Sequence, residues 1–305
     1  MRPLRFLLLL LILAPSGARA EDGGWLDSGK QWVQQLWRDD STEWLERING
    51  AVANHNYKGV LVLVQGAEIN TLAVEHRMLN GVESLRMRTL SGAPRELVKK
   101  GDKIQSNSLG ASVQSFSPAA SGQITFSHFA NAAGNKSYKT RLGEKARVAG
   151  RATQVIDITA EDAWRYSYRL WLDTETGLPL KVITLDERGY AVDQFVFTQI
   201  EITPASGKAK APNVPQSREI KSPFKEVKGF RVIAAESRAG STHYLFSDGL
   251  ASISLYVEPS KQKEKAQMRR DGVNGLMLGD GSIRYVAMGK VPVATLEKIL
   301  AQTQR

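Results

Sequence analysis

Turn signals recur between short runs of strand-forming residues, and this spacing constrains the fold more than any other feature of the chain. The signals are Asn80-Gly81, Ser91-Gly92, Gly101-Asp102, Thr176-Gly177 and Arg188-Gly189. Glycine-containing pairs of this kind permit the tight turns that join neighbouring antiparallel strands. The pattern therefore predicts a meander of antiparallel strands connected by hairpins.

The predicted strands form two groups on either side of a stretch rich in Pro, Ser, Gly, Ala and Lys. The first group comprises residues 60–65, 72–78, 84–90, 95–99, 103–108, 123–129, 153–159, 165–172, 180–185 and 190–202. The second comprises residues 229–237, 242–246, 251–257, 273–278 and 282–288. The stretch between them has no hydrophobic period, so we interpret it as a linker.

One of the predicted strands shows which of its faces should be buried. From 165 to 172, apolar and aromatic residues alternate with a set that contains two arginines. Successive side chains of a strand point to opposite faces of its sheet. One face should therefore pack, with Tyr166, Tyr168, Leu170 and Leu172, and the other should be largely solvated, with Arg165, Ser167, Arg169 and Trp171.

Helices are predicted at both ends of the strand pattern. Residues 24–54 suggest two of them, the first with Trp25, Trp32 and Trp37 near helical spacing and the second beginning at Asp40-Ser41-Thr42. A last helix is expected to begin at Pro292, because proline suits the first helical turn. The fold class is therefore α+β, with a large antiparallel sheet accompanied by helices and a small α+β unit after the linker.

The first twenty residues have the three parts of a secretory signal peptide. Arg2 and Arg5 precede nine consecutive apolar residues, 6–14, and Ala18-Arg19-Ala20 provides a small-residue cleavage site. A transmembrane helix needs about 20 apolar residues, so we expect cleavage rather than anchoring. We therefore predict an exported chain that is soluble after cleavage, and export argues against nucleic acid as a partner.

Once the predicted signal peptide is removed, the net positive charge lies in the last third of the chain. The net charge is +10, and removal of residues 1–20 with their three arginines lowers it to +7. Residues 21–202 carry −1 and residues 203–305 carry +8. We predict a signal peptide at 1–20, a large β domain with N-terminal helices at 21–202, a linker at 203–222 and a small basic domain at 223–305.

Catalytic and metal-binding patterns are absent from the sequence. The chain has no cysteine and only four scattered histidines, without the spacing of a metal site. Gly279-Asp280-Gly281 lacks the third glycine of a dinucleotide loop, and Glu161-Asp162 are typical of a solvated turn. We therefore predict no enzyme activity, no catalytic residues, no metal and no cofactor.

Two features favour binding, although each has a simpler interpretation. A curved antiparallel sheet covered by helices can enclose an apolar cavity for acyl chains, but the same aromatic residues can equally form a packed core. A basic run at Lys261, Lys263, Lys265, Arg269 and Arg270 can attract an anionic partner or simply be a solvated face.

Several segments, in order and spacing, resemble the RseB/MucB family of periplasmic regulators. In the first half they are Arg147-Val148-Ala149-Gly150-Arg151, Asp173 to Lys181 and Phe195-Val196-Phe197-Thr198-Gln199. In the second half they are Ser247 to Ala251, Tyr256-Val257-Glu258-Pro259 and Gly289-Lys290-Val291-Pro292. The resemblance runs from about Trp44 to the end of the chain. Residues 21–43 do not align with the family, and the Cys pair found in some members is missing.

The resemblance implies a function without catalysis. Members of the family bind the periplasmic region of a single-span anti-sigma factor, protect it from site-1 proteolysis and so restrain the envelope-stress sigma factor. It also implies that the large domain is a half-open barrel like that of periplasmic lipoprotein carriers, and that lipopolysaccharide or a related lipid releases the complex. A periplasmic lipid or lipoprotein carrier is the alternative, although a carrier would not need the basic small domain.

We expect two groups of binding residues. Lipid binding is assigned to Tyr166, Tyr168, Phe195 and Phe197 on the apolar face of the large sheet, and partner binding to Lys225, Lys228, Arg231, Arg269 and Arg270. A homo-oligomer is compatible with the sequence.

Overall fold

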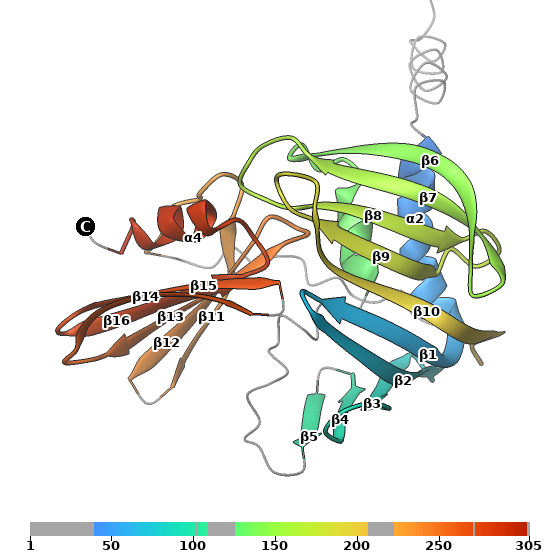
Figure 1. The fold of residues 1–305 in the computed structure, drawn as a ribbon, viewed down its shortest axis with the longest axis horizontal. Helices are drawn as coiled ribbons and strands as arrows, with labels where there is room; N and C mark the ends of the chain where they lie inside the picture. Colours follow the sequence, from blue (N-terminus) through green and yellow to red (C-terminus); the bar gives the residue numbers. More distant parts are fainter. Residues whose placement is uncertain are drawn as a thin grey trace, which may run out of the picture. The chain divides into compact units, whose positions relative to one another are not determined.

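The computed structural model describes residues 40–101, 103–108, 126–206, 223–238, 240–270 and 272–303 (Figure 1). The predicted signal peptide and the predicted helix with Trp25, Trp32 and Trp37 lie outside these residues, as does most of the predicted linker. Among the residues described, no helix is both long enough and apolar enough to cross a bilayer.

The first sheet has ten strands in the order β5-β4-β3-β2-β1-β10-β9-β8-β7-β6, and every neighbouring pair is antiparallel. The turn signals at 80–81, 91–92 and 101–102 separate consecutive strands, as predicted. The last strand returns beside the first, which joins two meanders into one sheet. The strands are β1 (His55–Gln65), β2 (Glu68–Leu79), β3 (Val82–Thr89), β4 (Arg95–Lys100), β5 (Lys103–Ser108), β6 (Tyr138–Val148), β7 (Arg151–Ala160), β8 (Ser167–Asp173), β9 (Pro179–Leu185) and β10 (Ala191–Pro204).

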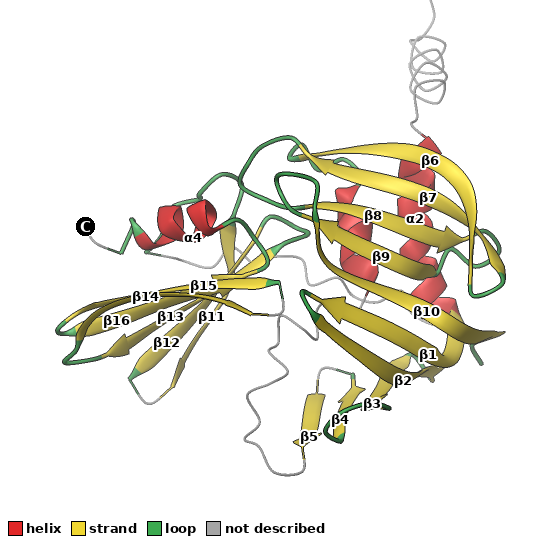
Figure 2. Ribbon diagram, in the orientation of Figure 1, coloured by secondary structure: helices red, strands yellow, loops and turns green. Residues whose placement is uncertain are grey.

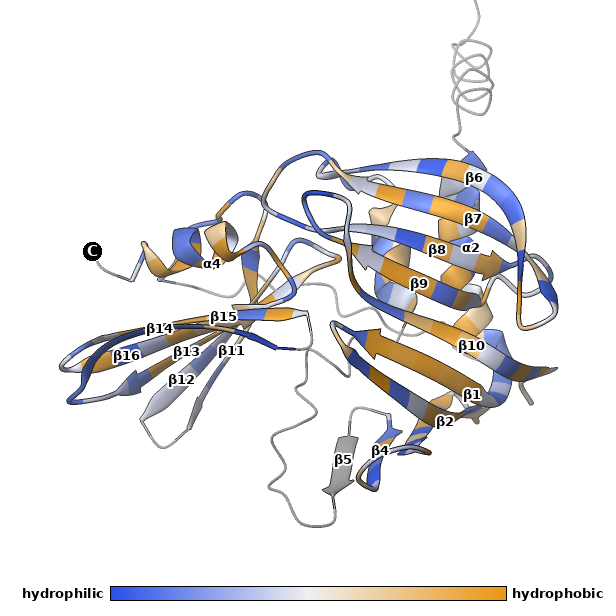
Figure 3. Ribbon diagram, viewed as in Figure 1, coloured by the Kyte–Doolittle hydropathy of each residue, from blue (hydrophilic) through white to orange (hydrophobic). Residues whose placement is uncertain are grey.

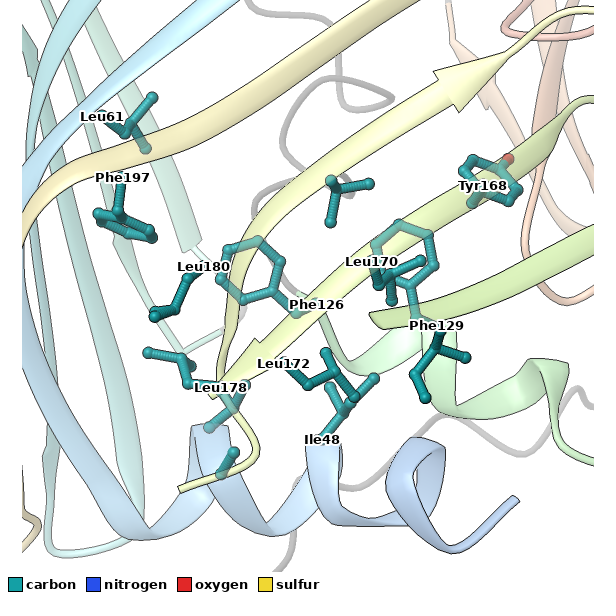
Figure 4. Packing of buried hydrophobic residues seen from close by; sticks show 14 of the residues in the cluster. Ile48, Leu61, Phe126, Phe129, Tyr168, Leu170, Leu172, Leu178, Leu180 and Phe197 are labelled. Atoms are coloured by element: carbon teal, nitrogen blue, oxygen red, sulfur yellow. The ribbon is translucent and has the colours of Figure 1, made fainter. Parts of the chain in front are cut away.

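Two helical segments pack against one face of this curved sheet. The α-helix α2 (Asp40–Asn54) buries Leu45 and Ile48, and the 3-10 helix η2 (Phe126–Ala132) buries Phe126 and Phe129. Figure 4 shows Ile48 and Phe129 pointing toward sheet residues such as Leu170 and Leu172. These side chains form the first hydrophobic core.

The predicted strand at 123–129 is wrong for its described part, because η2 begins at Phe126. The aromatic residues favoured a strand by propensity alone. A 3-10 helix has three residues per turn, so Phe126 and Phe129 lie on the same side of η2 and both contact the core.

The second sheet has six antiparallel strands in the order β11-β12-β13-β16-β15-β14 (Figure 2). One α-helix, α4 (Val293–Leu300), packs on it and buries Leu296 and Ile299 against Phe230, Phe246 and Ile253. The strands are β11 (Arg231–Arg238), β12 (Ser241–Ser247), β13 (Ser252–Pro259), β14 (Lys263–Arg270), β15 (Val273–Asp280) and β16 (Ile283–Gly289).

Strand β14 was not predicted. Its sequence, KEKAQMRR, has the charge of a solvated segment and few strand-forming residues. Pairing with β15 along its whole length forms the strand regardless of these low propensities. The basic run is therefore an edge strand of the second sheet.

The α+β fold class is confirmed, with a large curved antiparallel sheet covered by helices and a smaller sheet packed against one helix. Figure 3 shows hydrophobic residues along β1 and alternating bands on β7, β8 and β9. The alternation matches strands with one buried and one solvated face.

Candidate functional site

The two sheets are joined by a buried polar cluster centred on Arg165, just before β8. Its Nη1 lies 2.5 Å from Oδ2 of Asp248, and its Nε lies 3.0 Å from Oδ1 of Asp162. Nη2 also donates to the carbonyl of Lys228. The side chains of Arg165 and Asp248 are each only 1% exposed. The prediction that Arg165 faces solvent is therefore wrong, because a turn of the second sheet covers it.

Asp248, in the turn after β12, connects this cluster to both sheets. Its Oδ1 accepts from the backbone N–H groups of Leu250 and Ala251, which fixes the turn. The hydroxyl of Tyr138, on β6, donates to its Oδ2 at 2.9 Å. Burial raises the pKa of Tyr138 far above its ordinary value, so the phenol keeps its proton and acts as a donor.

Three further contacts with the first sheet and its flanking segments are made by side chains of Asn274, Lys290 and Thr295. Asn274 of β15, which is buried, donates to the hydroxyl of Tyr166 at 3.0 Å and to the carbonyl of Val291 at 2.8 Å. Lys290 forms an ion pair with Asp193, and Thr295 of α4 donates to the carbonyl of Trp164 at 2.7 Å. We name these contacts and the Arg165 cluster together the intersheet joint. Because it satisfies buried charges from both sides, it fixes the orientation of one sheet on the other.

Three of the four residues assigned to lipid binding lie on the covered face of the first sheet. Phe197 is 1% exposed, and Tyr168 is packed edge-on against Phe129 at 5.3 Å between ring centroids. Phe195 is half-buried and stacks on Phe126 at 5.1 Å. Helix η2 therefore occupies the apolar space next to these residues.

Tyr166 does not belong with the other three. It is buried, and its hydroxyl accepts the hydrogen bond from Asn274 in the intersheet joint. Burial raises its pKa, so this hydroxyl stays protonated at neutral pH. Alternation along the predicted strand 165–172 placed Tyr166 on the apolar face. In the structure Tyr166 lies just before β8, where Asn274 of the second sheet contacts it.

The five basic residues assigned to partner binding fall into two groups. Lys225, Lys228 and Arg231 lie before and at the start of β11, whereas Arg269 and Arg270 end β14, and all five are exposed. Strands β11 and β14 are opposite edges of the second sheet. Since the strands alternate in direction and neighbours are about 4.8 Å apart, the groups lie at one end of the sheet, on the order of 24 Å from each other.

Two of the segments that carry the family resemblance, one ending at Arg151 and one beginning at Asp173, contact each other on the first sheet. Asp173 accepts from Arg151 at 2.6 and 3.1 Å and from Thr176 at 2.9 Å. Arg47, on α2, donates to the carbonyls of Thr174 and Glu175 at 2.9 and 3.3 Å. These residues therefore hold the turn between β8 and β9 and anchor α2 to it.

Among the described residues, no three His, Cys, Asp or Glu side chains lie together in a group that could hold a metal ion. Glu161 is exposed in the segment between β7 and β8, and its neighbour Asp162 is paired with Arg165. Asp280 caps the turn before β16 through Ser282 and Ile283. Asp162 and Asp280 therefore have structural contacts in the fold.

Comparison with known proteins identifies two family models. The MucB/RseB N-terminal domain matches residues 40–217, and the MucB/RseB C-terminal domain matches residues 217–304. The sigma factor AlgU regulatory protein MucB of Pseudomonas aeruginosa is 26% identical over 286 residues, which cover 85% of this chain and 89% of that protein. The sigma-E factor regulatory protein RseB of Escherichia coli K12 is 25% identical over 282 residues, or 84% and 87%.

The solved structures agree with these relatives. The crystal structure of MucB in complex with MucA(peri) superposes with a TM-score of 0.65 at 26% identity, and the match covers 85% of this chain and 96% of that one. The crystal structure of MucB gives a TM-score of 0.64 at 26% identity, with the same coverage. The resemblance found in the sequence is therefore confirmed, and the chain belongs to the MucB/RseB family.

Proposed function

We propose that this chain is a periplasmic regulator that binds the periplasmic region of a transmembrane anti-sigma factor. By covering that region it would protect the anti-sigma factor from site-1 proteolysis and so restrain the envelope-stress sigma factor. One observation carries the proposal: both domains of the MucB/RseB family follow each other across residues 40–304. The relatives named above are sigma factor regulatory proteins, and one of them was solved with MucA(peri) bound.

The intersheet joint supports a binding function. Binding across two sheets costs less conformational entropy when the sheets already hold a fixed orientation, so the affinity is higher. Arg165 and Asp248 provide that constraint through an ion pair buried between them. The second sheet is thus presented to a partner as part of one surface with the first.

Charge supports an acidic partner. Residues 203–305 carry a net +8, and Lys225, Arg231 and Arg269 are exposed at one end of the second sheet. Complementary charge increases the rate of association and discriminates against neutral or basic competitors. Within this proposal the mature chain consists of a large domain at 21–202, a linker at 203–222 and a basic domain at 223–305, after a signal peptide at 1–20.

A lipid signal remains part of the proposal. Lipopolysaccharide or a related lipid would place an acyl chain against Tyr168, Phe195 and Phe197, where Phe126 and Phe129 of η2 now pack. Displacement of η2 would expose this face, and it would link lipid uptake to a change in the large domain. A lipid or lipoprotein carrier would use the same face without needing the basic domain.

The test measures binding of the mature chain to the purified periplasmic region of the anti-sigma factor from the same organism, by calorimetry. A second assay follows cleavage of that region by its site-1 protease with and without this chain. We expect a one-to-one complex and slower cleavage, and we expect added lipopolysaccharide to reverse both. Lipoprotein capture without any anti-sigma factor binding would favour the carrier instead.

A further inference from the structure

Strand β14 leaves one side of its backbone unpaired within the second sheet. It is the last strand in the sheet order and pairs with β15 from Lys263–Asp280 to Arg270–Val273. Seven of its eight residues are exposed, and Glu264 is half-buried. An edge strand of this kind can accept another strand through its main chain.

The hairpin geometry shows which backbone groups face outward. Only two residues separate Arg270 from Val273, so these paired residues close the turn and form a hydrogen-bonded pair. Hydrogen-bonded and non-hydrogen-bonded pairs alternate along an antiparallel ladder. The residues that turn their N–H and C=O groups away from β15 are therefore Lys263, Lys265, Gln267 and Arg269.

The edge of β14 is regular, unlike two other sheet edges. The pairing of β6 with β7 shifts register between Leu142 and Lys145, and that of β11 with β12 shifts between Val232 and Ala234. Such irregularities obstruct the addition of a strand. The pairing of β14 has no shift, and the strand contains no proline. Among these three edges, β14 is the one that presents an uninterrupted ladder.

The charge of β14 determines what can pair with it. Lys263, Lys265, Arg269 and Arg270 outweigh the single acidic residue Glu264. Like charges placed opposite each other destabilise a strand pair, so a second copy of β14 is repelled. An acidic strand is attracted for the same reason, and this selects a partner of opposite charge.

We infer that β14 binds an acidic, extended segment of the anti-sigma factor's periplasmic region, which adds to the second sheet as a seventh strand. The identity of the partner rests on the proposed function, whereas the mode of binding rests on the edge itself. Main-chain hydrogen bonds to Lys265, Gln267 and their outward-facing neighbours would supply affinity, and the basic side chains would select the acidic segment.

Calorimetry with the mature chain and the purified periplasmic region of the anti-sigma factor tests this inference. Lys263→Glu with Lys265→Glu should weaken binding at least tenfold and reduce its salt dependence. The matched control is Lys139→Glu with Lys145→Glu on the irregular edge β6, where both lysines are exposed and the change in charge is the same. The control should bind within twofold of the unaltered chain.

A second variant separates strand addition from charge. Gln267→Pro removes one outward N–H group without changing the charge, and an edge strand tolerates proline at such a position. It should also weaken binding at least tenfold while thermal unfolding shows that the protein remains folded. Hydrogen exchange should slow at the outward amides of β14 when the partner is bound to the unaltered chain.

The outcomes distinguish the inference from the proposed function. If the unaltered chain and all β14 variants bind equally, and no amide of β14 is protected, the inference is wrong and the proposed function stands. If only the charge reversal weakens binding, the partner contacts side chains without adding a strand, which also overturns the inference. If the unaltered chain does not bind the partner at all, both are wrong.

Discussion

Arg165 and Asp248 are 83 positions apart in the sequence and form an ion pair with 2.5 Å between Nη1 and Oδ2. Each side chain is 1% exposed. Two charges can be buried at this depth only when they are paired and further hydrogen-bonded. Asp162, Tyr138 and the carbonyl of Lys228 provide those additional bonds.

Asp248→Asn should lower the free energy of unfolding by about 3–5 kcal/mol, because it leaves the charge of Arg165 buried with one partner fewer. Asparagine keeps an oxygen that can accept from Leu250 and Ala251, so the turn itself is preserved. Urea unfolding at neutral pH measures the change. Glu258→Gln, which removes the half-exposed ion pair with Arg284, is the control and should cost less than about 1 kcal/mol. Equal losses in the two variants would contradict a special role for the buried pair.

The hairpin pairing of consecutive strands in the first sheet was largely predictable, because tight turns need residues that adopt particular backbone angles. Gly81, Gly92 and Gly101 have positive φ angles of 77°, 75° and 55°, which glycine adopts at little cost. Strand β6 and the pairing of β1 with β10 were not predicted. Strand β14 could not be predicted in the same way. Its residues form a strand only because β15 pairs with them, and this tertiary effect is not visible in local propensity.

The candidate site was predictable only in part, for a related reason. Alternation along the predicted strand 165–172 correctly placed Tyr168 on the covered face, but it misplaced Arg165, which lies before β8 begins and is covered by a turn of the second sheet. The family resemblance did mark the segment that contains Asp248, Ser247 to Ala251, as a feature of the family. The sequence does not show that Asp248 pairs with Arg165, because a contact between residues 83 positions apart is visible only in the folded structure.

Asp173 should make stability depend on acid pH. Its burial opposes ionisation, but hydrogen bonds from Arg151 and Thr176 outweigh burial and lower the pKa of this carboxyl. A lowered folded-state pKa adds stability above the unfolded pKa of about 3.9, and this stability is lost as the pH falls through the folded value. Asp173→Asn should therefore cost on the order of 2–3 kcal/mol at pH 7.

The test measures the unfolding free energy of the unaltered chain and of Asp173→Asn at several pH values between 7 and 2.5. The quantity of interest is the difference between the two proteins at each pH. The difference should be constant above about pH 5 and shrink below about pH 4, because protonated aspartic acid then resembles asparagine. Other carboxyl groups are common to both proteins and cancel in the comparison. A difference that grows on acidification would contradict the lowered pKa.

Gly177→Ala and Gly189→Ala should separate backbone strain from crowding. Both glycines have positive φ angles, 77° and 83°, so alanine costs about 1–2 kcal/mol at either position. A Cβ atom at Gly177 would lie 3.1 Å from Cβ of Arg47, whereas one at Gly189 meets nothing within 4 Å. Thermal unfolding should show a larger loss for Gly177→Ala, because α2 must shift. Equal losses would mean that α2 adapts freely.

Phe195 offers the sharpest test of lipid binding by the large sheet. It is half-buried and stacks on Phe126, so Phe195→Gln should cost only about 1–2 kcal/mol, less than a change at the fully buried Phe197. If acyl chains replace η2 on this face, a polar side chain there should reduce binding of lipopolysaccharide at least fivefold. Fluorescence titration with labelled lipopolysaccharide measures this binding. The matched control is Tyr190→Gln, because Tyr190 is 70% exposed between β9 and β10 and its loss should leave lipid binding unchanged. Full lipid binding by a folded Phe195→Gln variant would instead show that the aromatic residues of this face serve as a packed core.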